Sequence, residues 1–346
     1  MRYFFAALIF WTTCTTLPAQ WLKIKTPGIP RQADGKPNLA APAPRTPDGK
    51  PDLSGLWGTE DNTYPLNITA DLKPEEVRPW AQEVYKKRLD DLDKDTPGTR
   101  CLPGGPTEIL GGQYRIIQSP NVTGILYASG AYRQIFTDGR DLPKDPNPTW
   151  WGYSVGHWEG DTLVIQSAGF NDRTWLDFVG HPHTEDLRVT ERFHRRDFGH
   201  MQLEVTMDDP KTFTRPISIS LGVNYVPDTE MLEYVCNENE RDSAHLVGKA
   251  SDDVKGHVKV DAQVLSRYTG NYQAQQPKIK AVLSVSGDQL MFSLGGKGAV
   301  PLTTLSDTSF FFPGGFPMDF VKNEHGAVTH FLLHTPCGDF KFDRTE

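Results

Sequence analysis

The amino-acid sequence predicts an all-β protein built from an antiparallel β-barrel and a second, smaller β unit. Short segments rich in β-branched and aromatic residues recur at roughly ten-residue spacing between residues 114 and 236, and turn residues separate them. Glycine and proline are abundant, at 31 and 27 of 346 residues, as is typical of a chain with many turns. Residues 71–93 form the one stretch with a convincing helical periodicity. Together these observations favour strands over helices.

Residues 1–20 have the features of a secretory signal peptide. Arg2 supplies a positive charge, residues 4–11 are apolar, and a small residue precedes a cleavage point near residue 19 or 20. A lipoprotein signal would use Cys14, but the residues before it match that pattern poorly. No other apolar run approaches the ~18 residues that a membrane span needs. The sequence therefore predicts an exported protein, periplasmic or extracellular, with no membrane span.

Residues 21–51 are predicted to be a Pro/Gly-rich extended linker. The motif Asp-Gly-Lys-Pro occurs twice, at 34–37 and 48–51, and its residues favour turns. Two copies are too few for a repeat architecture. We expect this linker to lie on the surface or to tether the folded part.

Residues 52–240 are predicted to form the barrel domain. Gly55-Leu56-Trp57 at its first strand is a lipocalin-like feature, in which glycine permits a close approach and tryptophan plugs one end of the barrel. The clearest hairpin runs from Val155 to Gln166 and turns at residues 159–161. The fold class is therefore a lipocalin-like antiparallel β-barrel with one covering helix, followed by a second small β domain.

The covering helix is expected over residues 71–93. Asp71 can cap such a helix, and Pro74 suits its first turn. Pro79 would delay the start of the helix or kink it. A structural role over the barrel is expected for this helix.

The chain becomes polar at residues 241–260, which are predicted to be a second linker. Residues 261–346 are predicted to be the small C-terminal β domain. Within it, residues 282–285 and 289–292 are expected to pair across the turn Gly287-Asp288.

Three cysteines remain after signal cleavage, and the compartment is expected to be oxidising. Cys101 and Cys236 both belong to the barrel domain and are the expected disulfide, which leaves Cys337 as a free thiol. Three unpaired thiols are the alternative. The net charge is −8, or −9 once Arg2 is removed with the signal peptide. An acidic chain argues against a nucleic acid or an anionic membrane as partner.

The barrel domain carries a set of distinctive short motifs. They are Gly55-Leu56-Trp57, Arg100-Cys101-Leu102-Pro103, Asp138-Gly139-Arg140, Gly152-Tyr153-Ser154-Val155-Gly156, Trp158-Glu159-Gly160-Asp161-Thr162-Leu163-Val164, Gly169-Phe170-Asn171-Asp172, Gly180-His181-Pro182-His183 and Glu191-Arg192-Phe193. With these motifs, roughly residues 50–240 resemble a widespread family of exported bacterial proteins of unknown function. This resemblance implies no particular activity.

The C-terminal domain also has a resemblance of its own. Through Tyr268-Thr269-Gly270-Asn271-Tyr272 it is similar to the small β domain often appended to exported beta-lactamase-like hydrolases. The chain lacks the Ser-x-x-Lys motif that such hydrolases use, so their activity is not implied.

Histidines and carboxylates gather in residues 171–191. His181, His183 and Glu185 alternate along a segment that would place them on one face if extended, where they could hold Zn²⁺ or another divalent ion, with Asp177 or His194 completing the shell. The pattern resembles the His-x-His…Glu of cupin metal sites, at a shorter spacing. The alternatives are a metal-free functional site, or turn histidines that bond loop carbonyls.

The same region offers acid–base and ligand-binding groups. Asp177, with Asp172 as a weaker candidate, could act as general base or orienting carboxylate, with His181 or His183 as acid. Tryptophans could form a wall for a sugar face or a flat apolar ligand, and arginines could contact an anion inside the barrel. Arg115, Arg133 and Arg140 could equally pair with Glu191 or Glu233. The expected ligand-binding residues are Trp150, Trp151, Tyr153, Asn171, Arg173, Trp175, Arg115 and Arg140.

The sequence favours a barrel whose mouth or interior binds a small, partly apolar or glycosidic molecule. The alternatives are an acid–base hydrolase, lyase or isomerase using Asp177, His181 and His183, with or without a metal, and a structural envelope module. The motifs of dinucleotide turns, phosphate loops, serine-hydrolase elbows and His-Glu-x-x-His zinc enzymes are absent from the sequence. Accordingly no cofactor is expected, and a divalent metal such as zinc is the one alternative. The sequence leaves the oligomeric state open.

Overall fold

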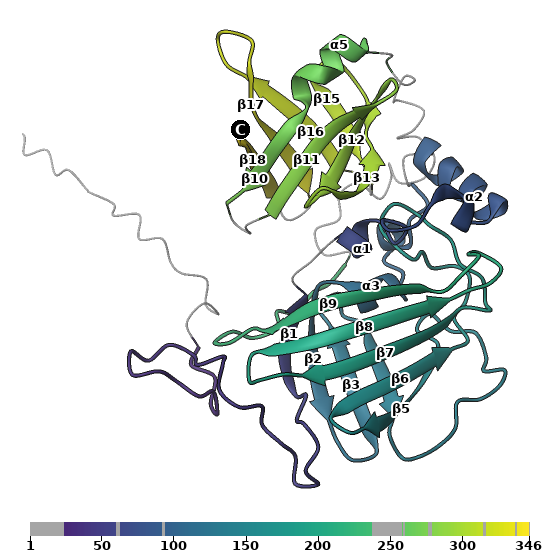
Figure 1. Cartoon of the computed structure of the whole chain (residues 1–346), viewed down its shortest axis with the longest axis vertical. Helices are drawn as coiled ribbons and strands as arrows, with labels where there is room; N and C mark the ends of the chain where they lie inside the picture. Colours follow the sequence, from purple (N-terminus) through teal and green to yellow (C-terminus); the bar gives the residue numbers. More distant parts are fainter. Residues whose placement is uncertain are drawn as a thin grey trace, which may run out of the picture.

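A computed structural model describes residues 24–59, 63–91, 94–236, 258, 260–275, 279–313, 316–335 and 338–345. The predicted signal peptide and nearly all of the predicted linker at 241–260 lie outside the described residues. The predicted all-β fold class is confirmed, because the strands form a closed barrel and a separate nine-stranded sheet (Figure 1). Among the described residues, no helix combines the length and the apolar character needed to cross a membrane.

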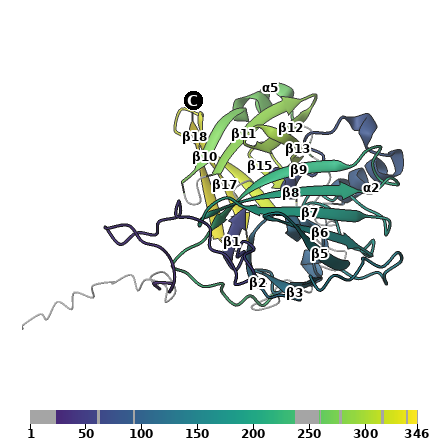
Figure 2. The same ribbon diagram turned by 60° about the horizontal axis from the view of Figure 1, so that its bottom comes forward.

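Nine strands close the barrel in the order of the sequence, as Figure 2 shows from its forward end. They are β1 (Gly55–Thr59), β2 (Gln113–Gln118), β3 (Val122–Tyr127), β4 (Tyr132–Phe136), β5 (Tyr153–Glu159), β6 (Thr162–Ala168), β7 (Arg188–Arg195), β8 (His200–Asp208) and β9 (Ile217–Tyr225). Neighbours are antiparallel except β4 and β5, which run parallel because residues 137–152 return the chain to the same end of the barrel. The predicted hairpin is present as β5 and β6.

Alternating side chains fill the barrel interior. Along β8, Met201, Leu203, Val205 and Met207 are buried, whereas the residues between them are more exposed. Buried apolar side chains from every strand of the barrel except β5 form one contiguous core, and the partly buried Trp158 of β5 packs against it. The interior of the barrel is therefore largely packed.

The predicted Gly-x-Trp feature closes one end of this barrel. Gly55 has φ +141°, and a Cβ at this position would lie 2.4 Å from the ring of Tyr225. Trp57 is fully buried, and the guanidinium of Arg195 stacks 4.8 Å from its ring centroid. Arg195 also donates a hydrogen bond to the carbonyl of Asp52. This cluster ties the first strand to the end of β7.

The second β unit is a nine-stranded sheet with an aromatic core. Its strands are β10 (Gly270–Ala274), β11 (Ile279–Ser286), β12 (Gln289–Leu294), β13 (Lys297–Pro301), β14 (Thr303–Thr304), β15 (Ser309–Phe312), β16 (Phe316–Lys322), β17 (Val328–Thr335) and β18 (Gly338–Thr345), and it begins with α5 (Ala262–Leu265) and η3 (Ser266–Tyr268). The sheet order is β13-β12-β11-β10-β18-β17-β16-β15-β14. The predicted pairing across Gly287-Asp288 is confirmed, since Val285 lies opposite Leu290.

The first strand of the second unit carries the same cluster of glycine, aromatic residue and arginine as the first strand of the barrel. Gly270 also has φ +141°, and Arg344 lies 5.9 Å from the ring of Tyr272. In the barrel, Trp57 donates a hydrogen bond to the carbonyl of Leu53, two residues before Gly55. In the second unit, Tyr272 donates to the carbonyl of Tyr268, two residues before Gly270. In both, the arginine bonds the carbonyl three positions before the glycine. The two units therefore anchor their first strands in the same way.

Among the residues that the structure describes, the connection from β1 to β2 holds most of the helical ones. Its elements are α1 (Thr63–Leu66), η1 (Pro74–Glu76), α2 (Pro79–Asp90), η2 (Pro97–Arg100) and α3 (Thr107–Leu110). Figure 1 places α2 beside both the barrel and the second unit.

The expectation of one helix capped by Asp71 is wrong at its start. Lys73 and Arg78 both have extended backbones because a proline follows each of them, so the segment divides into η1 and α2. The cap of α2 is Arg78, and Pro79 is its first residue. Pro79 therefore delays the helix, which was one of the two expected effects.

Residues 24–52, here called the N-terminal strap, lie along the barrel (Figure 1). Arg31 pairs with Asp228, and Arg45 pairs with Asp161 in the β5–β6 turn. Each of these arginines also bonds a glycine carbonyl four residues ahead, so that the two Asp-Gly-Lys-Pro turns dock in the same manner. The amide of Gly199 adds a backbone bond to the strap. The segment therefore lies on the surface of the barrel, one of the two expected arrangements.

Cys101 and Cys236 form the predicted disulfide, with Cα atoms 5.6 Å apart. The bridge joins the β1–β2 connection to the segment that follows β9. Cys337 lies outside the described residues.

Candidate functional site

Two long connections meet at one end of the barrel, here called the capped end. This end carries the last residues of β1, β3 and β6, and it lies opposite the end that the strap covers. The β1–β2 connection and residues 169–187 lie over it, and the second β unit packs against them. Leu66 and Val179 are buried in the same apolar cluster as the core of the second unit. Most of the predicted site residues belong to this junction.

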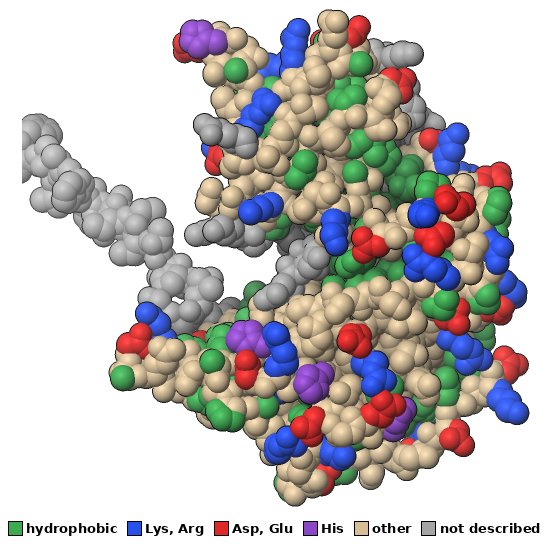
Figure 3. All heavy atoms as spheres, viewed as in Figure 1, with side chains coloured by type: hydrophobic (Ala, Val, Ile, Leu, Met, Phe, Trp, Pro, Cys, Tyr) green, Lys and Arg blue, Asp and Glu red, His purple; other side chains and the backbone are tan. Residues whose placement is uncertain are grey.

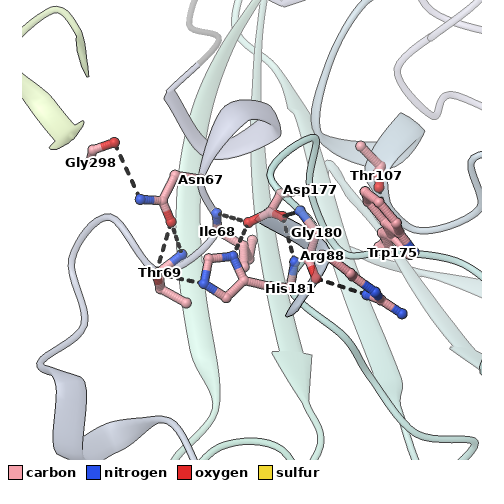
Figure 4. Close-up of polar contacts among 10 residues, drawn as sticks. All are labelled: Asn67, Ile68, Thr69, Arg88, Thr107, Trp175, Asp177, Gly180, His181 and Gly298. Atoms are coloured by element: carbon pink, nitrogen blue, oxygen red, sulfur yellow. Dashed lines mark hydrogen bonds and ion pairs between the residues drawn. The ribbon is translucent and has the colours of Figure 1, made fainter. Parts of the chain in front are cut away.

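Asp177 organises the loop of residues 169–187 (Figure 4). Its side chain is buried, and Oδ1 accepts hydrogen bonds from the amides of Gly180 and His181, both at 2.9 Å. Oδ2 accepts the amide of Ile68 at 2.7 Å and lies 2.5 Å from His181 Nδ1. Because an ionised carboxylate only accepts, Nδ1 of His181 carries the proton. Asp177 therefore joins two connections and sets the tautomer of His181.

His181 continues this network toward the second unit. Its Nε2 lies 3.3 Å from the hydroxyl of Thr69, which donates to Asn67 Oδ1 at 2.8 Å. Asn67 Nδ2 donates to the carbonyl of Gly298, in β13, at 3.2 Å (Figure 4). On its face, the imidazole stacks on Tyr85 of α2, with ring centroids 4.1 Å apart and an interplanar angle of 11°. One buried histidine thus connects the barrel loop, α2 and the second unit.

His183 is held separately, although it lies two residues away. Its Nδ1 donates to the carbonyl of Thr184 at 3.0 Å, and its Nε2 lies 2.6 Å from the hydroxyl of Thr174. Burial lowers the pKa of His183, which favours the neutral imidazole. Asp172 lines the same surface groove, of about 640 Å³, as His183. The expected catalytic trio is therefore split into an Asp177–His181 pair and a separate His183.

The residues of the expected metal site do not converge. His181 and His183 each bond other partners, and Glu185 is exposed on the surface. His194 lies on β7, beside Thr162. Across the described ranges, no group of three or more His, Cys, Asp or Glu side chains is placed to hold a metal ion. The physical reason is that residues 180–187 are irregular, so the alternation expected of an extended segment does not apply.

The three tryptophans do not form one wall. Trp151 stacks on Tyr127 at the capped end, with centroids 4.6 Å apart. Trp175 is buried under the guanidinium of Arg88, which lies 4.5 Å from its ring. Trp150 lies next to Gly105 through its backbone carbonyl.

The other expected ligand-binding residues are dispersed. Arg140 donates to the hydroxyl of Tyr153 at 2.9 Å and pairs with Asp138, at an exposed position. Asn171 accepts the amide of Arg173, whose side chain is exposed. The remaining residue, Arg115, lies on a partly exposed face of β2, 4.0 Å from Glu230. Thus Arg140 and Tyr153 lie together, and so do Asn171 and Arg173, but the set shares no common site.

Arg133 forms the buried pair that the sequence offered as one alternative. Its guanidinium contacts Glu191 at 3.1 and 2.7 Å inside the barrel. Both side chains are only 1% exposed. The carboxylate of Glu191 therefore occupies the position that an anionic ligand of Arg133 would take.

A pocket of about 650 Å³, here called the seam pocket, lies between α2 and the second unit. Tyr85 and Leu89 of α2 belong to one wall, and Leu302, Phe311 and Phe312 of the second unit belong to the other. The polar side chains of its lining are those of Lys86, Asp90, Asp288, Gln289, Thr303 and Thr304. Figure 3 shows hydrophobic side chains on the surface along this junction.

Sequence reasoning missed the residues of the seam pocket. One signal was present in the run Phe310-Phe311-Phe312, because three consecutive aromatic residues in a strand cannot all face one core. Phe310 and Phe312 are buried, whereas Phe311 is only partly buried and lines the pocket.

Comparison with known proteins yields little. No family model and no curated protein sequence matches the chain. Among solved structures, the octameric penicillin-binding protein homologue from Pyrococcus abyssi aligns with 58% of this chain, at 12% sequence identity and a TM-score of 0.18. The aligned part spans 39% of that protein's length. A likeness of this degree carries no argument, so the family resemblance of the motifs stays a prediction.

Proposed function

We propose that the protein binds a small, partly apolar molecule in the seam pocket. The observation that carries this proposal is the pocket itself, whose volume of about 650 Å³ falls within the range of known ligand sites. Tyr85, Phe311 and Phe312 offer aromatic surface for a flat ring or a sugar face. The two threonine hydroxyls and the charged groups of the lining can orient the polar part of such a ligand.

The hydrogen-bond network of Asp177 and His181 supports this proposal, because it holds both walls of the pocket. Tyr85 lines the pocket and stacks on His181. Asn67 bonds Gly298, three residues before Pro301 in the opposite wall. A pocket whose walls are fixed in advance loses less entropy on binding a ligand. In this proposal Asp177 and His181 are positioning residues.

Calorimetric titration with 4-nitrophenyl β-D-glucoside, 4-nitrophenol and glucose tests the proposal. We expect at least one of the two aromatic probes to bind, and the variant Leu89→Trp to abolish binding because the indole fills the pocket. Lys87→Trp is the matched control, since Lys87 is exposed on the same helix and does not line the pocket. Failure of both aromatic probes to bind, or equal binding by Leu89→Trp, would contradict the proposal.

A second candidate function is acid–base chemistry at His181. The observation in its favour is that Asp177 bonds Nδ1, which leaves Nε2 within 3.3 Å of the hydroxyl of Thr69. That hydroxyl donates to Asn67 in this structure, so it would have to turn its proton to Nε2 before His181 could act as its base. The side chain of His181 is only 5% exposed, so a substrate would reach it only if Tyr85 moved. Hydrolysis of 4-nitrophenyl acetate that is lost in both His181→Gln and Thr69→Val would support this function. Equal hydrolysis by the wild type and both variants would reject it.

Export remains part of the proposed function. It rests on residues 1–20, which lie outside the described residues. A role as a structural envelope module is the third alternative, and failure of all three probes to bind would favour it.

A further inference from the structure

The surface groove of about 640 Å³ that includes residues 182–184 lies beside α2 and is here called the α2 groove. Trp80, Val84 and Arg88 line its helical side, and because they are four residues apart they share one face of α2. Residues 182–184 and 210–211 contribute most of the remaining lining. No residue of this groove also lines the seam pocket, so a site here goes beyond the proposed function.

Buried Asp209 holds two sides of the α2 groove together. Its Oδ2 accepts a hydrogen bond from the amide of Thr184 at 2.6 Å. Its Oδ1 accepts from the hydroxyl of Thr184 at 3.0 Å and from the amide of Lys211 at 3.1 Å. The helical side is attached to the same β8–β9 connection, because the amide of Arg78 donates to the carbonyl of Thr212 at 2.9 Å. The walls of the groove are therefore fixed in advance, which lowers the entropy lost on binding a ligand.

Trp80 places an accessible aromatic surface in the α2 groove. It is 38% exposed, although its indole Nε1 donates a hydrogen bond to the carbonyl of Lys211 at 2.6 Å. That bond fixes the orientation of the ring, so its exposed part is a defined surface. Val84, Pro182 and Pro210 add apolar surface to the same lining. Such an aromatic face suits the C–H groups of a sugar ring.

The lining of the α2 groove is more basic than the chain as a whole. Arg78, Arg88 and Lys211 contribute three positive charges, whereas Asp172 contributes one negative charge. His183 adds no charge at neutral pH, since burial lowers its pKa and favours the neutral imidazole. The whole chain carries a net charge of −8, so this groove is a local exception that favours an anionic ligand.

The three cations of the groove differ in their existing partners. Arg88 donates to the carbonyl of Gly180 at 2.8 Å and is engaged within the protein (Figure 4). Lys211 pairs with Asp186 at 2.7 Å. The side chain of Arg78 is exposed, and among the described residues no carboxylate forms an ion pair with it. Arg78 is therefore the cation that can bind an incoming anion without giving up a partner.

We propose that the α2 groove binds an acidic oligosaccharide, with one sugar ring stacked on Trp80 and a carboxylate paired with Arg78. Arginine suits this role because its planar fork bonds both oxygens of a carboxylate. The stripe from Trp80 to Arg88 spans about 12 Å at the α-helical rise per residue, so it suits an extended ligand better than a single sugar. Asp172 favours a saccharide over an acidic peptide, because its carboxylate accepts hydrogen bonds from sugar hydroxyls but repels a further carboxylate.

Calorimetric titration of the full chain with trigalacturonate and trimannuronate tests the proposal, with tryptophan fluorescence as a second readout. We expect at least one of these acidic trisaccharides to bind and to change the fluorescence of Trp80. The fully methyl-esterified form of the probe that binds keeps the rings but not the charge, and it should bind about tenfold more weakly. Triglutamate, which carries carboxylates on a peptide, should also bind more weakly. Salt should weaken binding of the acid, because the ion pair is exposed.

Four variants locate the binding site. Arg78→Gln should weaken binding about tenfold. Lys87→Gln is the matched control, because it removes one positive charge from an exposed position of α2 that lines neither the groove nor the seam pocket, and it should bind as the wild type does. Trp80→Phe keeps an aromatic ring without the indole and should remove the fluorescence change. Leu89→Trp, which fills the seam pocket, should leave binding unchanged.

The proposal is overturned if neither acidic trisaccharide binds, if the methyl ester or triglutamate binds as tightly as the acid, or if Arg78→Gln and Lys87→Gln bind equally. A fluorescence change that persists in Trp80→Phe, or a loss of binding in Leu89→Trp, would also contradict it, because each would place the ligand elsewhere.

Discussion

The buried ion pair of Arg133 and Glu191 allows a quantitative test of the fold. In Glu191→Gln, the guanidinium of Arg133 stays inside the barrel without its counter-charge. Both side chains are only 1% exposed, so water cannot replace the lost carboxylate. Breaking one partner of a buried pair costs about 3–5 kcal/mol, because the remaining charge is left uncompensated. For a domain of this size that corresponds to a melting temperature lower by roughly 6–20 °C.

The matched control removes both charges. In the double variant Arg133→Met/Glu191→Leu no buried charge remains, and apolar replacement of a buried pair is often neutral or stabilising by about 1–4 kcal/mol. This double variant also removes the donor that Arg133 provides to the hydroxyls of Tyr127, Ser154 and Ser167, which costs some stability. We therefore expect its free energy of unfolding to lie below that of the wild type and above that of Glu191→Gln.

Urea unfolding followed by tryptophan fluorescence is the appropriate assay. All eight tryptophans precede residue 176, so the signal reports on the barrel and not on the second β unit. A loss below about 1 kcal/mol in Glu191→Gln, or a double variant no more stable than the single one, would refute the reasoning from an uncompensated buried charge.

Three further predictions concern the disulfide, a buried histidine and the seam. Replacing Cys101 and Cys236 by serine removes a bridge across 135 residues and should lower the free energy of unfolding by about 2–5 kcal/mol in urea; an unchanged midpoint would contradict a structural role. Burial lowers the pKa of His183 in the folded protein below its value of about 6.5 in the unfolded chain. The unfolded chain therefore binds a proton more readily, so the free energy of unfolding is highest above about pH 6.5 and decreases as the pH falls toward the folded pKa. The melting temperature should fall on acidification from neutral pH, less so in His183→Gln, and equal slopes would reject this assignment. Gly298→Ala should loosen the second unit and speed proteolysis at the seam, because Gly298 has φ +60° and the added Cβ would lie 2.7 Å from that of Ala70; a wild-type digestion pattern would show that the seam does not need this contact.

Local patterns in the sequence were sufficient for the fold class. The hairpin at Glu159-Gly160-Asp161 depends on turn residues and alternation that are adjacent in the chain, and the structure pairs its strands accordingly. The disulfide could also be inferred, because Cys101 and Cys236 were the two cysteines of the barrel domain. The division of the predicted helix at Pro79 followed from the extended conformation that proline imposes on the preceding residue.

The candidate site could be predicted only in part. Asp177 and His181 lie four residues apart and meet in one network, so proximity in the sequence was a useful guide. The same reasoning joined His183 to them wrongly, because the loop is irregular and each histidine turns to its own partners. No local sequence pattern indicates both walls of the seam pocket. Tyr85 and Leu302 are distant in the chain and line the same pocket only because the two units pack together.

The arginines of the barrel show most clearly what the sequence by itself determined and what the tertiary structure decided. Alternation along a strand determines the face of each residue, so Arg115, between buried Tyr114 and Ile116, points away from the interior, and the expectation that it would contact a ligand inside the barrel was wrong. By the same rule Arg133 alternates with exposed neighbours and points inward. That Arg133 meets Glu191 depends on how the strands close into one barrel, and so does the lack of a hydrogen-bond partner for the Tyr114 hydroxyl among the described residues. Closure brings together residues from strands that are not neighbours, and no local pattern records that juxtaposition.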